Sequence, residues 1–302
     1  MVSIAHLNVA GPPGFRDSDH CGPPPPSRGK NGPDPVVRPI MTTLADRTIA
    51  ALRASHDVLA ALVPGLTEEQ LRSPSGAAEW SLAQVLSHLG SGAEIGLGNL
   101  AAARDGEPLP GQDANQEVWD RWNSMRPREQ ATGFVEHNAR LVAAFEALTA
   151  DQRAALRFDF GFLPEPLPLT AVAGMRLNES TLHSWDARVA LDADAAVPED
   201  AARLLLEHLA GDLGFMTGFT AKADALAKPA TVQVGEGPVG LVIADKVSVT
   251  TAVTDPTATF VGPLDAVLRL IGGRLAPAHT PAGVEVIGDV SLDELRAVFP
   301  GY

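Results

Sequence analysis

The chain contains a single cysteine, Cys21, among its 302 residues. One cysteine excludes both an intramolecular disulfide framework and a cysteine-rich zinc site. Any thiol chemistry would therefore need a thiol supplied from outside the chain. Such sparing use of cysteine is typical of a reducing compartment, and we expect a cytoplasmic protein.

Long apolar runs are also missing. No segment approaches the roughly 18 consecutive apolar residues of a membrane-spanning helix, and the N-terminus lacks the basic stretch and apolar stretch of a secretory signal. Basic residues are scarce, since 23 Lys and Arg against 37 Asp and Glu give a formal net charge of -14. Because this charge repels polyphosphates and anionic surfaces, we expect neither a nucleic acid nor a membrane as a partner.

Residues 1–40 are rich in proline and glycine and have no sustained hydrophobic periodicity. Such a segment buries too little surface to offset its chain entropy, so we predict a disordered tail that includes Cys21. Helical patterning begins abruptly at Met41, which is a candidate start of the folded unit or of translation.

Residues 41–226 have the pattern of a helical domain, in which apolar residues recur at helical spacing. Ser81 is a candidate N-cap, Pro127 should kink or split the helix in which it lies, and Pro198 should open another helix. The expected helices cover residues 44–62, 81–104, 113–148, 171–191 and 198–219.

After Lys228-Pro229 the pattern changes to short β-branched runs, ATVQV, VGLVI and VSVTTAVT, separated by turn signals. A strand and a short helix follow in TATFVGPLDAVLRLIGGRL, then a strand in VEVIGD and a last helix in LDELRAVF. Residues 227–302 therefore predict a small α+β domain. The predicted fold class is α+β, with a helical bundle followed by this second domain.

The stretch NESTLHSWD contains Glu179 and His183 four positions apart. On a helix, such residues share one face with Cβ atoms roughly 6 Å apart, so they could bind one cation together. A catalytic zinc site takes three protein ligands and keeps one position open. His88 is the best third candidate, because its helix carries a stripe of apolar residues that should face inward.

The spacing alone is a weak motif. With eight histidines, chance should give roughly two pairs of histidine with an acid or another histidine four apart, and the chain has two. The second pair is His208 with Asp212 in EHLAGD. Either pair could instead be a hydrogen bond on a helix surface, so spacing leaves the choice open.

Two longer segments carry a family resemblance. EWSLAQVLSHLGSGAEI resembles the Trp-(Ser/Thr)-x-x-x-x-(Val/Leu)-x-x-His-Leu signature of the mycothiol-dependent maleylpyruvate isomerase family, and NESTLHSWDARVAL resembles that family's Glu-x-x-x-His-x-Trp-Asp helix. This family belongs to the DinB-like metal-binding four-helix bundles, and the resemblance implies that His88, Glu179 and His183 correspond to its zinc ligands. LDAVLRLIGGRL and VEVIGD look like its sterol-carrier-like C-terminal domain.

For each charged residue near these segments, a role in the site and a role at the protein surface are both possible. Asp186 could accept the second ring N–H of His183, or it could pair with Arg188 at the surface. Arg269 and Arg274 are candidates to bind a substrate carboxylate, because a guanidinium offers two parallel donors. The resemblance points to Arg274 as the catalytic arginine, and a solvated arginine at a helix end is the alternative.

The resemblance implies an enzyme that binds Zn²⁺ and uses mycothiol, or a similar low-molecular-weight thiol, as nucleophile toward a small electrophilic substrate. It would act as a cis-trans isomerase of the maleylpyruvate type or as a thiol S-transferase, and the sequence does not decide between them. Another divalent metal, a zinc hydrolase using bound water, and a non-catalytic module that binds a metal or an apolar ligand stay open. We expect a monomer.

Overall fold

The computed structural model describes residues 42–77 and 79–301. The tail predicted for residues 1–40, with Cys21, lies outside the described residues. The α-helices are α1 (Leu44–Leu62), α2 (Glu68–Arg72), α3 (Leu82–Asp105), α4 (Gln112–Asn123), α5 (Pro127–Glu146), α6 (Ala150–Ala155), α7 (Leu169–Val189), α8 (Glu199–Leu209), α9 (Thr217–Thr220), α10 (Leu264–Ile271) and α11 (Leu292–Val298). The strands are β1 (Arg157–Phe158), β2 (Leu167–Pro168), β3 (Ala230–Val234), β4 (Gly240–Ile243), β5 (Val247–Thr250), β6 (Ala258–Val261) and β7 (Glu285–Gly288).

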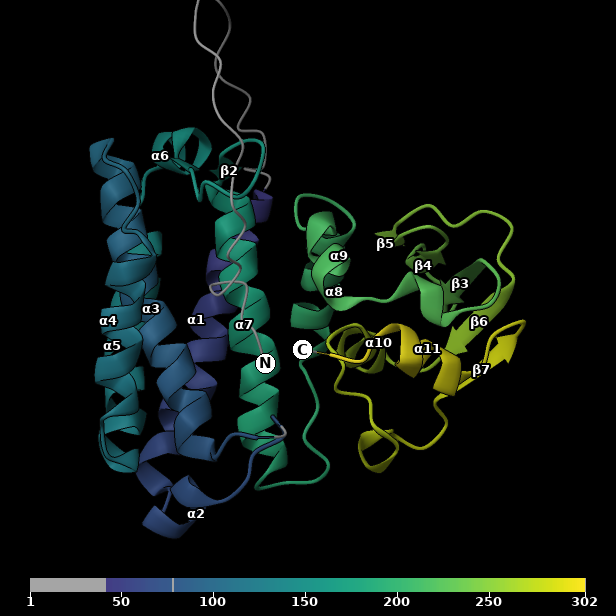
Figure 1. Cartoon of the computed structure of the whole chain (residues 1–302), viewed down its shortest axis with the longest axis horizontal. Helices are drawn as coiled ribbons and strands as arrows, with labels where there is room; N and C mark the ends of the chain where they lie inside the picture. Colours follow the sequence, from purple (N-terminus) through teal and green to yellow (C-terminus); the bar gives the residue numbers. More distant parts are fainter. Residues whose placement is uncertain (1–41, 78, 302) are drawn as a thin grey trace, which may run out of the picture.

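Helices α1, α3, α5 and α7 form an elongated bundle, in which α3 packs along α5 and α1 along α7 (Figure 1). The predicted first helix is confirmed, since α1 spans residues 44–62. The predicted cap at Ser81 is also confirmed. Its hydroxyl accepts from the Gln84 N–H over 3.3 Å, and the Gln84 side chain accepts from the Ser81 N–H over 2.9 Å. This capping box starts α3 about two turns before His88.

The predicted kink or split at Pro127 takes the form of a split, because Pro127 is the first residue of α5 and separates it from α4. Another predicted helix differs from the structure. The helix predicted over residues 198–219 ends at Leu209. Gly211 and Gly214 follow in a turn, where the Leu213 N–H donates to the His208 carbonyl and closes the helix end.

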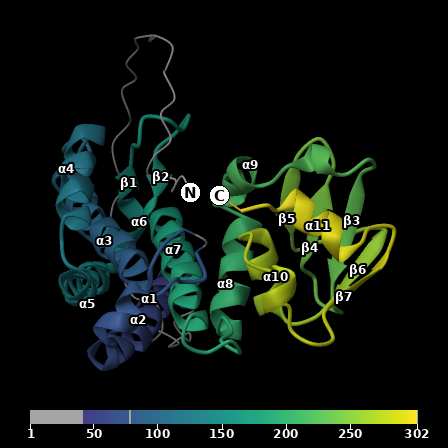
Figure 2. The ribbon, with the colours of Figure 1, turned by 60° about the horizontal axis from the view of Figure 1, so that its bottom comes forward.

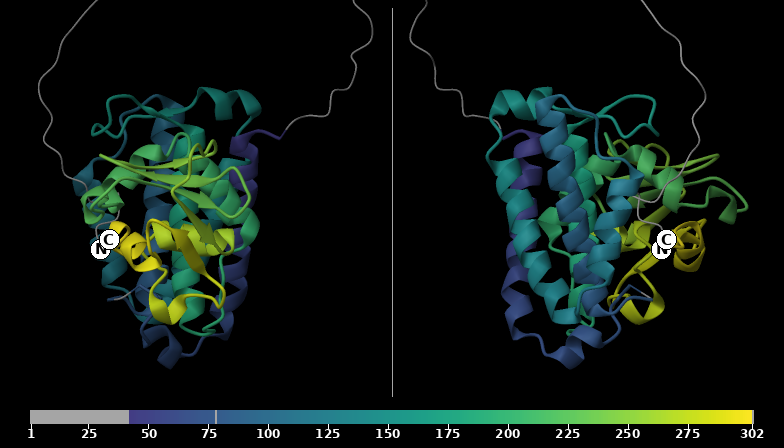
Figure 3. Two further views of the ribbon diagram at one scale, coloured as in Figure 1. Left: turned by 90° about the vertical axis from the view of Figure 1, so that its right-hand side faces the viewer. Right: turned by 60° about the vertical axis from the view of Figure 1, so that its left-hand side comes forward.

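The C-terminal part has a five-stranded sheet in the order β5-β4-β3-β6-β7. Strands β3, β4 and β5 form an antiparallel meander, β6 then pairs in parallel with β3, and β7 closes the edge antiparallel to β6. The sheet lies to one side of the bundle (Figure 3). The α+β fold class, with a helical bundle followed by an α+β unit, is confirmed.

Helix α8 joins the two parts, because it contacts α7 on one side and α10 on the other (Figure 2). One cluster of buried apolar side chains runs without interruption from Leu182 of α7 through Leu205 of α8 to Leu268 of α10 and on to the sheet. The domain boundary predicted between residues 226 and 227 stays a prediction. Within the described ranges, no helix combines the length and the hydrophobicity needed to cross a bilayer.

Candidate metal centre

Helices α3 and α7 bring together the three side chains that the sequence singled out. His88 comes from α3, and Glu179 and His183 come from successive turns of α7. Nε2 of His88 lies 2.8 Å from Oε2 of Glu179, and Nε2 of His183 lies 3.7 Å from the same oxygen. One ligand atom from each residue lies within 4.8 Å of the other two, and this is the one such group of three found among the residues that the structure describes.

Packing holds both imidazoles in place. The ring of Trp80, just before the α3 cap, lies 5.0 Å from the centre of the His88 ring and 5.7 Å from that of His183. His88 is 15% exposed, Glu179 20% and His183 7%, so the three donors are largely withdrawn from solvent. A polar cluster this well shielded is costly unless its members satisfy one another or hold an ion.

Asp186, one turn further along α7, orients His183 through the ring nitrogen that points away from Glu179. Oδ2 of Asp186 lies 2.8 Å from Nδ1 of His183, and the side chain of Asp186 is fully buried. Because the carboxylate accepts a hydrogen bond from the Nδ1–H, the lone pair of the neutral ring is left on Nε2, which faces Glu179. The alternative pairing of Asp186 with Arg188 is absent, since Arg188 donates to Ser184 and to the Ala196 carbonyl.

Arg274 lies behind this pair. Its Nε and Nη2 donate to the two carboxylate oxygens of Asp186 over 2.9 and 2.7 Å, and its Nη1 donates to the Gly272 carbonyl over 2.8 Å. The Arg274 side chain is 8% exposed. It therefore acts on the cluster through Asp186 and His183, and its contact with a substrate stays a prediction. Arg269, the other candidate, is held by Asp265 and by the His279 carbonyl.

Charge inside the cluster shifts the protonation of its members. Burial raises the pKa of Glu179, but the hydrogen bond from His88 and the positive charges of His88, His183 and Arg176 outweigh it and lower the pKa to about 2. Burial lowers the pKa of His183 below its ordinary value despite the hydrogen bond to Asp186. At neutral pH the cluster thus offers a carboxylate and a neutral imidazole, which are the protonation states that a metal needs.

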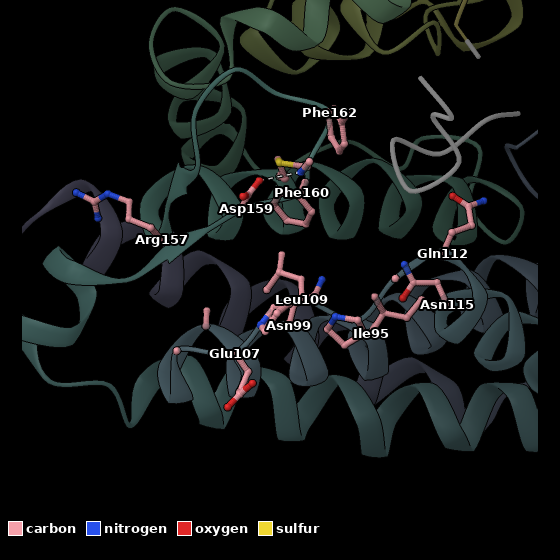
Figure 4. Close-up of a pocket in the computed structure, with 17 residues that line it drawn as sticks. Ile95, Asn99, Glu107, Leu109, Gln112, Asn115, Arg157, Asp159, Phe160 and Phe162 are labelled. Carbon is pink, nitrogen blue, oxygen red and sulfur yellow. Dashed lines mark hydrogen bonds between the residues drawn. The ribbon is translucent and has the colours of Figure 1, made fainter. Parts of the chain in front are cut away.

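A cavity opens beside the cluster. The inner cavity, of about 150 Å³, is bordered by His88, Arg176 and Glu179 and by apolar side chains that include Leu141 and Phe145. The outer cavity, of about 720 Å³, is shown in Figure 4. The two cavities share the residues Ile95, Asn99, Phe160 and Met175. The two cavities are therefore neighbours along α3.

Sequence reasoning missed Arg176, which lies one turn before Glu179 on α7 and lines the inner cavity. Burial lowers the pKa of its guanidinium to about 10, so Arg176 stays charged at neutral pH. A signal was present, because a lone arginine in the otherwise weakly polar run TAVAGMRLN is unusual unless the charge has a partner or a function.

The second histidine-acid pair, His208 with Asp212, belongs to no cluster of described residues that could hold a metal. His208 is fully buried, and its Nε2 lies 2.8 Å from the Thr48 hydroxyl, which itself donates to the Leu44 carbonyl. Asp212 is exposed on the turn after α8. The two pairs that spacing could not tell apart are therefore separated by burial and by their neighbours.

Comparisons with known proteins agree with the architecture. Residues 52–188 match the family model described as the mycothiol maleylpyruvate isomerase N-terminal domain, which confirms the resemblance read from the two helix motifs. The structure is similar to the crystal structure of the mycothiol-dependent maleylpyruvate isomerase, with a TM-score of 0.57 and 17% identity over 87% of this chain and 100% of that chain. A mutant of that enzyme gives the same values. No curated protein sequence matches the chain.

Proposed function

Because residues 52–188 belong to the mycothiol maleylpyruvate isomerase N-terminal domain family, we propose that this protein is a metal-dependent enzyme that uses mycothiol to isomerise a cis-enedioyl acid. The observation that supports this proposal most directly is the convergence of His88, Glu179 and His183 beside the inner cavity. Mycothiol and a small electrophilic acid are the two reactants.

The donor set fits Zn²⁺. Two imidazole nitrogens and one carboxylate oxygen are ligands that zinc accepts, and the hydrogen bond from His183 to Asp186 leaves Nε2 free to bind it. Two neutral histidines and one glutamate leave a bound dication with a net charge of about +1. When bound, Zn²⁺ would lower the pKa of the mycothiol thiol so that the thiolate predominates at neutral pH.

The protein side chains prepare the reaction. Asp186 and Arg274 keep His183 in one tautomer and one orientation, and the indole of Trp80 covers the two imidazoles. Leu141 and Phe145 give the inner cavity apolar walls, against which the carbon chain of the acid would lie. The outer cavity has room for the remainder of the thiol, whose sulfur would then reach the inner cavity.

The thiolate sulfur forms a bond to one carbon of the cis double bond, and the electron pair moves onto the adjacent carbonyl as an enolate. The former double bond is now single and rotates. Return of the electron pair re-forms the double bond in the trans geometry and expels the thiolate unchanged. If the enolate is protonated before the carbon–sulfur bond breaks, the product is a thioether and the enzyme is an S-transferase.

Zinc content and turnover test the proposal. We expect about one zinc per chain in wild-type protein grown with added zinc, and little in His88→Ala. His137→Ala is the matched control, because His137 lies on α5 beside Glu94 and outside the cluster, so this variant should keep its zinc. Absence of stoichiometric metal in the wild type would remove the metal from the proposal.

Turnover assays then distinguish the isomerase reaction from S-transfer. Maleylpyruvate with mycothiol should give the trans isomer without consuming thiol, and a stable thioether would instead identify a transferase. Mycothiol should raise the melting temperature of zinc-loaded protein only, because a native-state ligand stabilises the form that binds it. Equal protection of zinc-free protein would exclude a direct link between zinc and the thiol.

A further inference from the structure

Arg176 is a charged side chain in the wall of the inner cavity that interacts with the Glu179 carboxylate only at a distance. Its Nη2 donates to the Leu89 carbonyl and to the Asn138 side-chain oxygen, both over 2.7 Å. Both acceptors are neutral, and no salt bridge among the described residues includes Arg176. A buried cation is costly unless it is paired. The charge of Glu179 partly offsets this cost, but no anion is bound directly to the guanidinium, so Arg176 can still bind one.

Two nitrogens of Arg176 make no hydrogen bond to any described residue. Nε is buried, whereas Nη1 lies beside Gly92 of α3, which also lines the inner cavity. A Cβ atom added at Gly92 would lie 3.0 Å from Nη1 and would meet no other heavy atom within 4 Å. The missing side chain at residue 92 therefore keeps the approach to Nη1 clear.

The other arginines near the cluster are already engaged. All three guanidinium nitrogens of Arg274 have partners in Asp186 and the Gly272 carbonyl, and Arg274 lines neither cavity. Arg157, on the rim of the outer cavity, is exposed and donates to the Ala154 and Leu156 carbonyls. Arg176 is thus the arginine that borders the inner cavity together with His88 and Glu179.

We propose that Arg176 is the specificity-determining residue of the inner cavity and that its Nη1 binds a carboxylate of the electrophilic substrate. Residues three apart on a helix are neighbours, so a carboxylate on Arg176 lies next to Glu179 and the reacting atoms. The substrate class is a small unsaturated carboxylic acid, whose carbon chain lies against the apolar walls. This inference deepens the proposed function and rests on it for the reaction that follows binding.

Arg176 also ties α7 to α3 and α5 through Nη2, and a purely structural role would use that nitrogen alone. The test must therefore separate charge recognition from folding. Binding of succinate, an unreactive dicarboxylate, is measured by calorimetry on zinc-loaded protein without thiol, with succinamide as the neutral analogue.

We expect wild-type protein to bind succinate and not succinamide. Arg176→Gln should bind succinate about 10- to 100-fold more weakly, the loss expected for a hydrogen bond to a charged group. Gly92→Ala keeps the charge and the Nη2 bonds but blocks Nη1, so it should weaken succinate binding by about tenfold and stay folded even if Arg176→Gln does not. Arg157→Gln, the matched control, should bind as wild type.

The inference is overturned if wild-type protein fails to bind succinate, if Gly92→Ala binds it as wild type does, or if Arg157→Gln is the variant that loses binding. Failure of the proposed function is a different result. In that case succinate binding depends on Arg176 and Gly92, but no thiol-dependent turnover occurs with any unsaturated acid.

Discussion

Asp186 and Arg274, 88 positions apart in the chain, form a buried bidentate ion pair directly behind His183. The same carboxylate lies 2.8 Å from Nδ1 of His183, so one aspartate connects the residues after α10 to the helix that carries two of the three donors. The α+β part of the chain therefore helps to orient the cluster through Arg274, although none of the three candidate metal ligands comes from it.

Asp186→Asn tests this relationship. An amide keeps the volume but no longer fixes the proton on Nδ1, and we expect zinc affinity to fall about 10- to 100-fold, as for other residues that orient a metal histidine. Competition for zinc with a chelator of known affinity measures the change.

Asp265→Asn is the matched control, because Asp265 forms a buried ion pair of 2.7 Å with Arg269 away from the cluster. Both variants should lose stability, since each leaves an arginine without its anion. Only Asp186→Asn should lose zinc affinity, and equal affinities in the two variants would contradict the role given to Asp186.

Removal of the metal should destabilise the wild-type protein. A ligand bound only by the folded state stabilises it by about 2.7 kcal/mol at a concentration 100 times its dissociation constant. We expect EDTA to lower the melting temperature of wild-type protein and to leave that of His88→Ala unchanged. An identical response of both proteins would argue against zinc binding at His88.

Gly90→Ala should destabilise the bundle. An added Cβ would collide with the ring of Trp122 and would lie 3.1 Å from Cα of Phe134, both buried where α3 and α5 pack together. Overpacking of this kind costs about 1–3 kcal/mol. Gly98→Ala on the same helix meets only Pro110, at 3.7 Å, so it should stabilise by up to about 1 kcal/mol. Urea unfolding of both variants measures the contrast.

His208 should make stability depend on pH. Burial lowers the pKa of His208, and its Nδ1 has no partner among the described residues. The unfolded chain then binds a proton more readily than the folded one, so stability is complete above the unfolded pKa of about 6.5 and falls as the pH drops below it.

We expect His208→Gln, which keeps a donor for the Thr48 hydroxyl, to reduce this loss by up to about 1.4 kcal/mol per pH unit between pH 7 and pH 5. Urea unfolding at several pH values measures this pH dependence. Zinc-loaded protein is used, so that the candidate metal ligands His88 and His183 do not titrate. The same slope in both proteins would assign the pH dependence to other groups.

The local features of this protein were determined by its sequence. The bounds of α1, the capping box at Ser81 and the split at Pro127 follow from rules that span one or two turns of chain. The spacing that puts Glu179 and His183 on one face of α7 is equally local. The apolar stripe on its helix already made His88 the best third candidate, and the family motif supported this choice across the 91 positions to Glu179.

Tertiary structure decided which polar side chains face one another. Spacing could not separate Glu179 and His183 from His208 and Asp212, because an interval of four residues does not reveal which face a helix buries. The ion pair of Asp186 with Arg274 and the open space that Gly92 leaves beside Arg176 both arise where distant segments pack together. These contacts depend on the assembled fold, so no local pattern in the chain contains them.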